Sequence, residues 1–242
     1  MLREALSGFG WFTLYYIIGA TLLILMRTYL NLPKELFRKM LHMVCVLSVF
    51  VLLYAFDTWY SAALCAILFA IVIYPIIHWL ERFPKVMELL IQRRSGEIKF
   101  SLMIVFFMMA VLIFVFWGLL GPSWKYIIIA AIMAWGLGDA AAALVGKHLG
   151  KRHFKLRFAD KKKTVEGSLS MCIVSALAIL MTLLISTALP WYWCLLAALI
   201  AAPIASYVEL VSGACMDTLT VPLATAAPLF LLVFLASRIG GF

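Results

Sequence analysis

The chain has 242 residues, of which 66% are hydrophobic and only 13% are charged. A soluble domain is usually about 45–50% apolar and about 25% charged, so the composition excludes an ordinary water-soluble globule and a disordered chain. Lys and Arg outnumber Asp and Glu by 20 to 11, which gives a formal net charge of +9. Because membrane orientation explains this basic excess, we expect no nucleic-acid partner.

Long apolar runs predict about eight transmembrane helices, since a helix needs roughly 20 apolar residues to cross a bilayer. In chain order the runs lie near residues 9–26, 40–56, 59–80, 100–120, 124–145, 167–189, 191–211 and 221–237. No internal repeat and no polar linker divides the sequence. We therefore expect an all-α, polytopic membrane protein with a single integral membrane domain over residues 1–242.

Basic residues are concentrated in alternate connections between these runs. The connections after the first, third and fifth runs contain 17 of the 20 Lys and Arg residues: Arg27, Lys34, Arg38 and Lys39; Arg82, Lys85, Arg93, Arg94 and Lys99; and Lys147, Lys151, Arg152, Lys155, Arg157, Lys161, Lys162 and Lys163. Short basic loops stay in the cytoplasm, so the sequence predicts both termini on the opposite side. Because the N-terminus does not resemble a transit peptide, we expect a prokaryotic plasma membrane.

An acidic residue inside an apolar run is not explained by orientation. Asp139 lies in the stretch GLGDAAAA, and an Asp near a helix centre costs about 2.5–3.5 kcal/mol on insertion scales. A structural ion pair with a nearby Lys is one explanation. A functional site is the other, and it is the usual reason for an ionisable residue within a membrane.

Three further carboxylates approach the same predicted cytoplasmic rim. Glu166 begins the sixth run, Glu209 lies in the last turns of the seventh, and Asp217 lies in the loop that follows. Carboxylates and water hold Mg²⁺, usually together with substrate phosphates, and Lys and Arg neutralise those phosphates. Four carboxylates beside a strongly basic loop therefore predict a site that uses Mg²⁺ and a nucleoside triphosphate. Glu166 alone could simply favour the N-terminus of its helix.

Glycines and a histidine leave alternatives open. Gly136, Gly138, Gly146 and Gly150 either let backbone amides approach phosphate or let membrane helices pack closely, and no Walker motif is present. Arg38 and His42 are four residues apart and share one face of the second predicted helix. His42 is either a core histidine or a catalytic one.

Four sequence blocks resemble the motifs of a known family. Residues 138–168, GDAAAALVGKHLGKRHFKLRFADKKKTVEGS, are similar to the G-D-x-x-A-x-x-x-G-x-x-x-G-[KR] … K-K-T-x-E-G-[ST] signature of CTP-dependent lipid-alcohol kinases. RKMLH at 38–42, VEL at 208–210 and DTLTVPL at 217–223 resemble the other three motifs, in the family's order. The family includes dolichol kinase, phytol kinase and the CTP-dependent diacylglycerol kinase of fungi. Thr218 stands where the family commonly has Asn.

This resemblance implies a transferase that uses CTP and Mg²⁺ to phosphorylate a lipid alcohol, of the polyprenol, phytol or diacylglycerol type, that enters from the membrane. Asp139 and Asp217 would hold Mg²⁺ with help from Glu166 or Glu209, and Asp139, Asp217 or His42 would accept the hydroxyl proton. The expected nucleotide-binding residues are Arg38, Gly146, Lys147, Lys151, Lys162, Lys163, Thr164 and Gly167.

Two other functions compete with this one. CTP:phosphatidate cytidylyltransferases share the central block, but they end in a Gly-His-Gly-Gly … Asp-Arg-x-Asp element, whereas this chain reads MDTLTVPLATAAP. A membrane transporter often shows paired repeats and charges near the bilayer midplane. We rank the kinase first, the cytidylyltransferase second and the transporter last.

Overall fold

The computed structural model describes residues 2–30, 32–83, 88, 96–154, 163–213 and 216–240. Over these residues the regular structure is helical, and eight helices are long and apolar enough to cross a membrane. This confirms the expected all-α fold class. The chain divides into two compact units, Met1–Pro122 and Ser123–Phe242, and each is described by itself.

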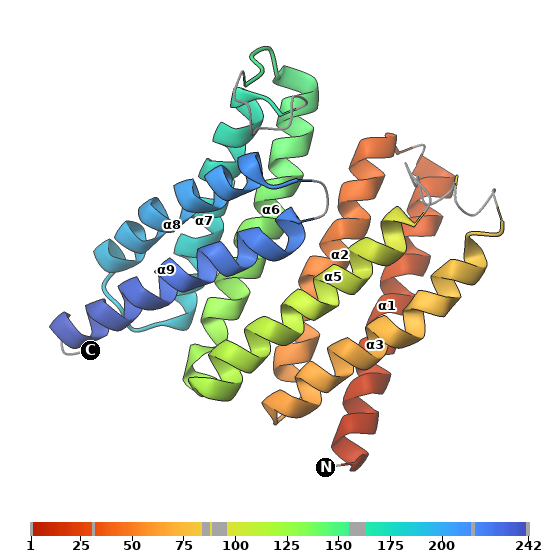
Figure 1. The fold of residues 1–242 in the computed structure, drawn as a ribbon, viewed down its shortest axis with the longest axis horizontal. Coiled ribbons are helices and arrows are strands. Elements are labelled where there is room, and N and C mark those ends of the chain that lie inside the picture. Colours follow the sequence, from red (N-terminus) through yellow and green to blue (C-terminus); the bar gives the residue numbers. More distant parts are fainter. Residues whose placement is uncertain are drawn as a thin grey trace. The chain divides into compact units, whose positions relative to one another are not determined.

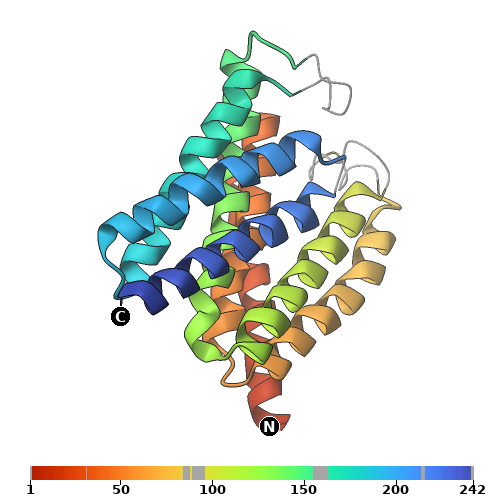
Figure 2. The same cartoon turned by 60° about the vertical axis from the view of Figure 1, so that its left-hand side comes forward.

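The first unit contains α1 (Leu2–Leu30), α2 (Lys34–Tyr54), α3 (Trp59–Leu80) and α5 (Glu97–Leu112). The last of these continues into the π-helical segment η1 (Ile113–Leu119). Helices α3 and α5 run side by side (Figures 1 and 2). Rings of Phe12, Tyr16, Phe69 and Phe106 meet with centroids 4.8–6.0 Å apart. This aromatic cluster from α1, α3 and α5 forms the centre of the unit.

The carboxylate of Glu81 joins the adjoining ends of α3 and α5 in the first unit. Glu81, just after α3, accepts hydrogen bonds from Lys99 Nζ at 2.7 Å and from the backbone N–H of Gly96 at 2.9 Å. Gly96 precedes α5 with φ of +82°, a left-handed conformation that glycine adopts without steric cost. The α3–α5 pair is therefore closed by an ion pair and a backbone hydrogen bond at one end.

The second unit contains α6 (Lys125–Leu149), α7 (Val165–Ser186), α8 (Trp191–Val211) and α9 (Asp217–Gly240), preceded by the short 3₁₀ turn η2 (Pro122–Trp124). Helix α6 packs against α7 and α9, and α8 packs against the same two helices. Figures 1 and 2 show that the end of α6 and the start of α7 continue beyond the adjoining ends of α8 and α9.

Small residues allow α6 and α7 to approach closely. A Cβ on Gly138 would lie well inside van der Waals contact with Ser175 Oγ and 3.0 Å from Met171 Cγ. A Cβ on Gly167 would lie 2.9 Å from the carbonyl oxygen of Ala142. Helix packing therefore explains Gly138, which is the second of the two roles that the sequence left open for it, and it gives Gly167 a structural reason to lack a side chain.

The start of α9 differs from the sequence expectation. We expected Asp217 in a loop before a helix at 221–237, but it is the first residue of α9. Its Oδ1 accepts a hydrogen bond from the backbone N–H of Thr218 at 2.8 Å, and an acidic side chain in the first turn also favours the helix dipole. Hydropathy missed this turn because its polar residues do not extend the apolar run.

A candidate metal and phosphate site

Three carboxylates from three helices meet in the second unit. Asp139 on α6, Glu209 on α8 and Asp217 on α9 each offer one oxygen, and these oxygens all lie within 4.8 Å of one another. Glu209 is buried, with 6% of its surface exposed, while the two aspartates are partly exposed. We call Asp139, Glu209 and Asp217 the acidic group.

The close packing of α6 against α7 determines where Asp139 points. Successive residues on an α-helix are rotated by about 100°. Gly138 faces α7, so the side chain of Asp139 leaves α6 from a neighbouring face and reaches the carboxylates of α8 and α9. Gly138 therefore packs against α7, while the adjacent Asp139 contributes its carboxylate to the acidic group.

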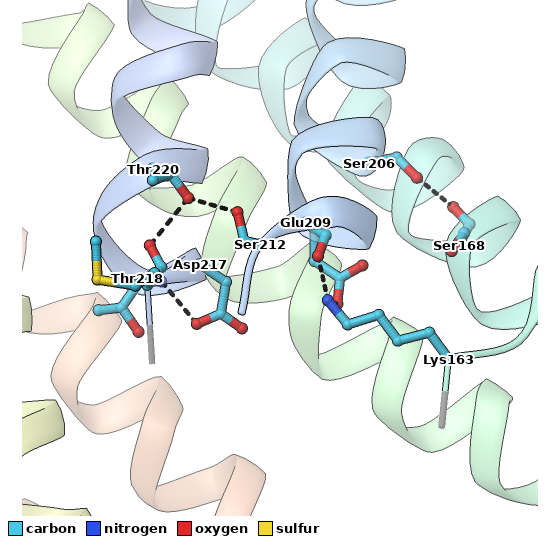
Figure 3. Close-up of polar contacts among 9 residues, drawn as sticks. Lys163, Ser168, Ser206, Glu209, Ser212, Asp217, Thr218 and Thr220 are labelled. Atoms are coloured by element: carbon cyan, nitrogen blue, oxygen red, sulfur yellow. Dashed lines mark hydrogen bonds and ion pairs between the residues drawn. The ribbon is translucent and has the colours of Figure 1, made fainter. Parts of the chain in front are cut away.

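A lysine ammonium is in direct contact with the acidic group. Lys163 Nζ lies 2.9 Å from Glu209 Oε1 and also donates a hydrogen bond to the backbone carbonyl of Glu209. Figure 3 shows the lysine side chain extended toward the end of α8. Only 19% of the Lys163 side chain and 8% of the Glu209 side chain are exposed, so this ion pair is far less screened by water than a surface pair.

Hydroxyl groups fix the ends of α8 and α9 around the acidic group. Ser206 Oγ donates to the backbone carbonyl of Ser168 on α7 at 2.8 Å, one turn before Glu209. The hydroxyl oxygens of Ser212, which ends α8, and Thr220 in α9 are 2.8 Å apart (Figure 3). Sequence reasoning missed the three hydroxyl groups of Ser206, Ser212 and Thr220, although a Ser or Thr in or next to an apolar helix is a signal for an interhelical hydrogen bond.

Thr164 holds the backbone that carries Lys163. It is the N-cap of α7, and its Oγ1 accepts a hydrogen bond from the N–H of Gly167 at 3.2 Å. Thr164 also pairs with His153 in an isolated antiparallel bridge, and the N–H of Val165 donates to the carbonyl of Arg152 at 2.9 Å. The two ends of the basic connection are therefore bound to each other beside the acidic group.

The two glycines expected to bind nucleotide surround this threonine. A Cβ on Gly146 would lie 3.0 Å from Thr164 Oγ1, and the amide of Gly167 already donates to the same oxygen. Both glycines have a structural reason to lack a side chain. Their proposed contact with nucleotide stays a prediction.

Glu166 lies apart from the acidic group. It is in the first turn of α7, and its carboxylate accepts a hydrogen bond from the backbone N–H of Arg152 at 3.3 Å. In the described part of the chain, the three carboxylates that lie within 4.8 Å of one another are those of Asp139, Glu209 and Asp217, and Glu166 is not among them. This position matches the dipole-stabilising role that the sequence offered as its alternative.

The remaining expected site residues are placed as follows. Lys147 at the end of α6 and Lys151 after it are exposed, and Lys162 lies outside the described residues. Arg38 and His42 belong to the first unit, where Arg38 forms an ion pair with Glu35 one turn earlier on α2. The parts expected for Arg38 and His42 in binding and catalysis stay predictions.

The donor set suits a hard divalent cation. The acidic group offers carboxylate oxygens from three rigid helices, and oxygen is the donor that Mg²⁺ prefers. Neither a thiol nor an imidazole belongs to the group, which disfavours zinc, since that ion favours sulfur and nitrogen ligands. Asp139, Glu209 and Asp217 are therefore residues that could hold a metal ion of this kind.

The chain was compared with family models, curated proteins and solved structures. No protein-family model, no curated protein and no solved structure matches the chain.

Proposed function

We propose that the protein is a CTP- and Mg²⁺-dependent kinase that phosphorylates a lipid alcohol at the cytoplasmic face of a membrane. The observation that carries this proposal is the acidic group in contact with Lys163. Carboxylates that bind a divalent ion, together with lysines that bind phosphate, are the parts that phosphoryl transfer requires. The choice of CTP and of a lipid alcohol is supported by the motif resemblance of residues 38–42, 138–168, 208–210 and 217–223.

The reaction is a displacement at phosphorus. The hydroxyl oxygen of the lipid alcohol bonds to the γ-phosphorus of CTP, and the bond from that phosphorus to the oxygen bridging the β- and γ-phosphates breaks. CDP leaves with the electron pair, and the hydroxyl proton passes to a carboxylate of Asp139 or Asp217. A bound Mg²⁺ would stabilise negative charge on the phosphate oxygens.

The chain's own residues supply positioning and charge. Lys163 is adjacent to the acidic group, and Lys147 and Lys151 are exposed near the same end of α6. Their ammonium groups would neutralise the triphosphate, since phosphoryl transfer depends mainly on positioning and electrostatic stabilisation.

The outer face of α7 is suited to contact with lipid. Leu169, Ile173 and Leu177 are spaced four residues apart on that helix and are 53–59% exposed. They form an apolar stripe that begins one turn after the N-cap Thr164. An isoprenoid or acyl chain could therefore stay in the hydrocarbon while its hydroxyl approaches the acidic group.

Labelled CTP tests the proposal directly. The purified protein in lipid nanodiscs is incubated with Mg²⁺, a mixture of phytol, farnesol, long polyprenols and diacylglycerol, and CTP labelled at either the γ- or the α-phosphate. A kinase transfers the γ-label to lipid and leaves the α-label in CDP. The Asp139→Asn variant, prepared in the same way, is the control for contaminating kinases.

The same assay distinguishes the competing functions. With phosphatidic acid added, a cytidylyltransferase transfers the α-label to lipid and releases the γ-label in pyrophosphate. Transfer of neither label contradicts both enzyme proposals and favours the transporter.

A further inference from the structure

A cation already contacts one carboxylate of the acidic group in the structure. The ammonium of Lys163 contacts both a carboxylate oxygen and the backbone carbonyl of Glu209. The partner carboxylate is buried, and its Oε1 lies at ion-pair distance from Nζ. A divalent ion that used this carboxylate would therefore compete with a bound positive charge for the same negative charge.

Electrostatics disfavours the simultaneous presence of both cations without a further anion. The three oxygens of the acidic group lie within 4.8 Å of one another, so an ion among them would lie close to the Lys163 ammonium. Repulsion between cations at such distances is weakly screened where water is largely excluded. A triphosphate supplies additional negative charge that can bind the divalent ion and the displaced ammonium together.

We propose that Lys163 is an internal cation that occupies the acidic group in the nucleotide-free protein and is replaced there by a divalent ion. The ammonium then binds the phosphates of the nucleotide. This inference rests on the proposed function for the identity of the nucleotide, but its first step concerns the metal ion alone.

The local structure allows this exchange without rearrangement of the helices. The neighbouring Thr164 is held by its cap to Gly167 and by its bridge to His153. The lysine side chain is a flexible four-carbon stem that carries the ammonium at its end. The ammonium can therefore leave Glu209 by rotation of side-chain bonds while the start of α7 stays in place.

The exchange makes metal and nucleotide binding cooperative. A divalent ion alone must displace Lys163 and so binds weakly, whereas the ion with triphosphate provides the ammonium with a new partner. By linkage, each ligand then raises the affinity for the other by the same factor. A lysine that only contacted phosphate would leave the affinity for metal alone unchanged.

Mn²⁺ binding measured by electron paramagnetic resonance tests this prediction without any enzyme assay. The full-length protein in nanodiscs is titrated with Mn²⁺ in the absence of nucleotide, as wild type, as Lys163→Met and as Arg152→Met. We expect Lys163→Met to bind Mn²⁺ roughly tenfold more tightly than wild type, equivalent to about 1.4 kcal/mol. Arg152 is exposed on the same connection, so its variant controls for the loss of one nearby positive charge and should match wild type.

The outcomes separate this inference from the proposed function. Equal or weaker Mn²⁺ binding by Lys163→Met, or equal tightening in both variants, overturns the inference. If none of the proteins binds Mn²⁺, the acidic group is no metal site and both proposals fail. Tighter binding by Lys163→Met alone supports the inference, even if the labelled-CTP assay shows no lipid kinase.

Lysine labelling of the wild-type protein provides a second test that needs no variant. Reductive methylation followed by mass spectrometry compares Lys163 with the exposed Lys147. We expect saturating Mn²⁺ to increase the methylation rate of Lys163 several-fold relative to that of Lys147. An unchanged ratio at saturating Mn²⁺ would show that the ammonium stays on Glu209 and would refute the exchange.

Discussion

Gly138 on α6 lies so close to Ser175 on α7 that a β-carbon on the glycine would overlap the serine hydroxyl. Ser175 Oγ donates to the carbonyl of Ala134, one turn before Gly138, at 2.8 Å. The serine is therefore held against α6 and has little freedom to yield. This contact sets the spacing of the two helices next to Asp139.

Substitution of Gly138 by Ala should separate α6 from α7. We expect Gly138→Ala to destabilise the protein by about 1–3 kcal/mol, as overpacking of a tight core does, and to lower the thermal unfolding midpoint in detergent. Gly10→Ala is the matched control, because a Cβ there meets nothing within 4 Å and Ala favours the helix by about 0.5–1 kcal/mol. The double variant Gly138→Ala/Ser175→Ala lacks the serine hydroxyl and should recover part of the lost stability. If it does not, the overlap between the new Cβ and Ser175 Oγ is not the cause of the destabilisation.

Asp139→Asn should abolish lipid phosphorylation while the protein remains folded. The amide retains the shape of the side chain but loses the negative charge that would bind Mg²⁺. Loss of a partner that only supports a metal ligand typically costs about 10–100-fold, and we expect loss of a ligand itself to lower kcat by at least about a hundredfold. Gel filtration and the unfolding midpoint should stay near those of wild type. Retained activity would remove Asp139 from the metal site.

Lys163→Ala should weaken nucleotide binding in the enzyme assay. Loss of an ammonium that contacts phosphate is expected to raise the KM for CTP by roughly tenfold or more, since a hydrogen bond to a charged group contributes about 1.5–3 kcal/mol. Initial rates over a range of CTP concentrations at saturating Mg²⁺ provide the measurement. If KM is unchanged, Lys163 does not contact the phosphates of the nucleotide.

Thr164→Ala should reduce both stability and nucleotide affinity. Loss of an N-cap hydroxyl typically costs about 1 kcal/mol, and here it also frees the backbone next to Lys163. Thr164→Ser retains the hydroxyl and should restore the KM for CTP. An alanine variant with a normal KM would show that the cap does not position the lysine.

The sequence predicts the membrane-spanning helices well because each one depends on local composition. The apolar runs are long enough to define eight spans, and the structure contains eight such helices in the described residues. The same signal places Asp217 wrongly, because hydropathy detects where a helix is apolar and not where its hydrogen bonds begin. The first turn of α9 contains Asp217 and Thr218, which a hydropathy profile assigns to a loop.

The composition of the candidate site is less predictable, because it depends on the rotation of each helix. Sequence reasoning named Asp139, Glu209 and Asp217, which the structure brings together, and also Glu166, which it places beside the backbone of Arg152. Glu166 is close to Lys163 in sequence, but Lys163 precedes the N-cap Thr164 whereas Glu166 lies in the first turn of α7, so the two side chains meet different partners. The pairing of Lys163 with Glu209 joins residues 46 positions apart, and no local pattern encodes it.

The ion pair between Lys163 and Glu209 also has a consequence for how the polypeptide is made. A lone carboxylate near the end of α8 would oppose entry of that segment into the lipid. The ribosome synthesises Lys163 before Glu209, so the counter-ion has already emerged when the acidic residue leaves the exit tunnel. The nascent chain can therefore neutralise this charge as α8 inserts. Loss of Lys163 would then make insertion of α8 less favourable, in addition to removing the ion pair from the mature protein.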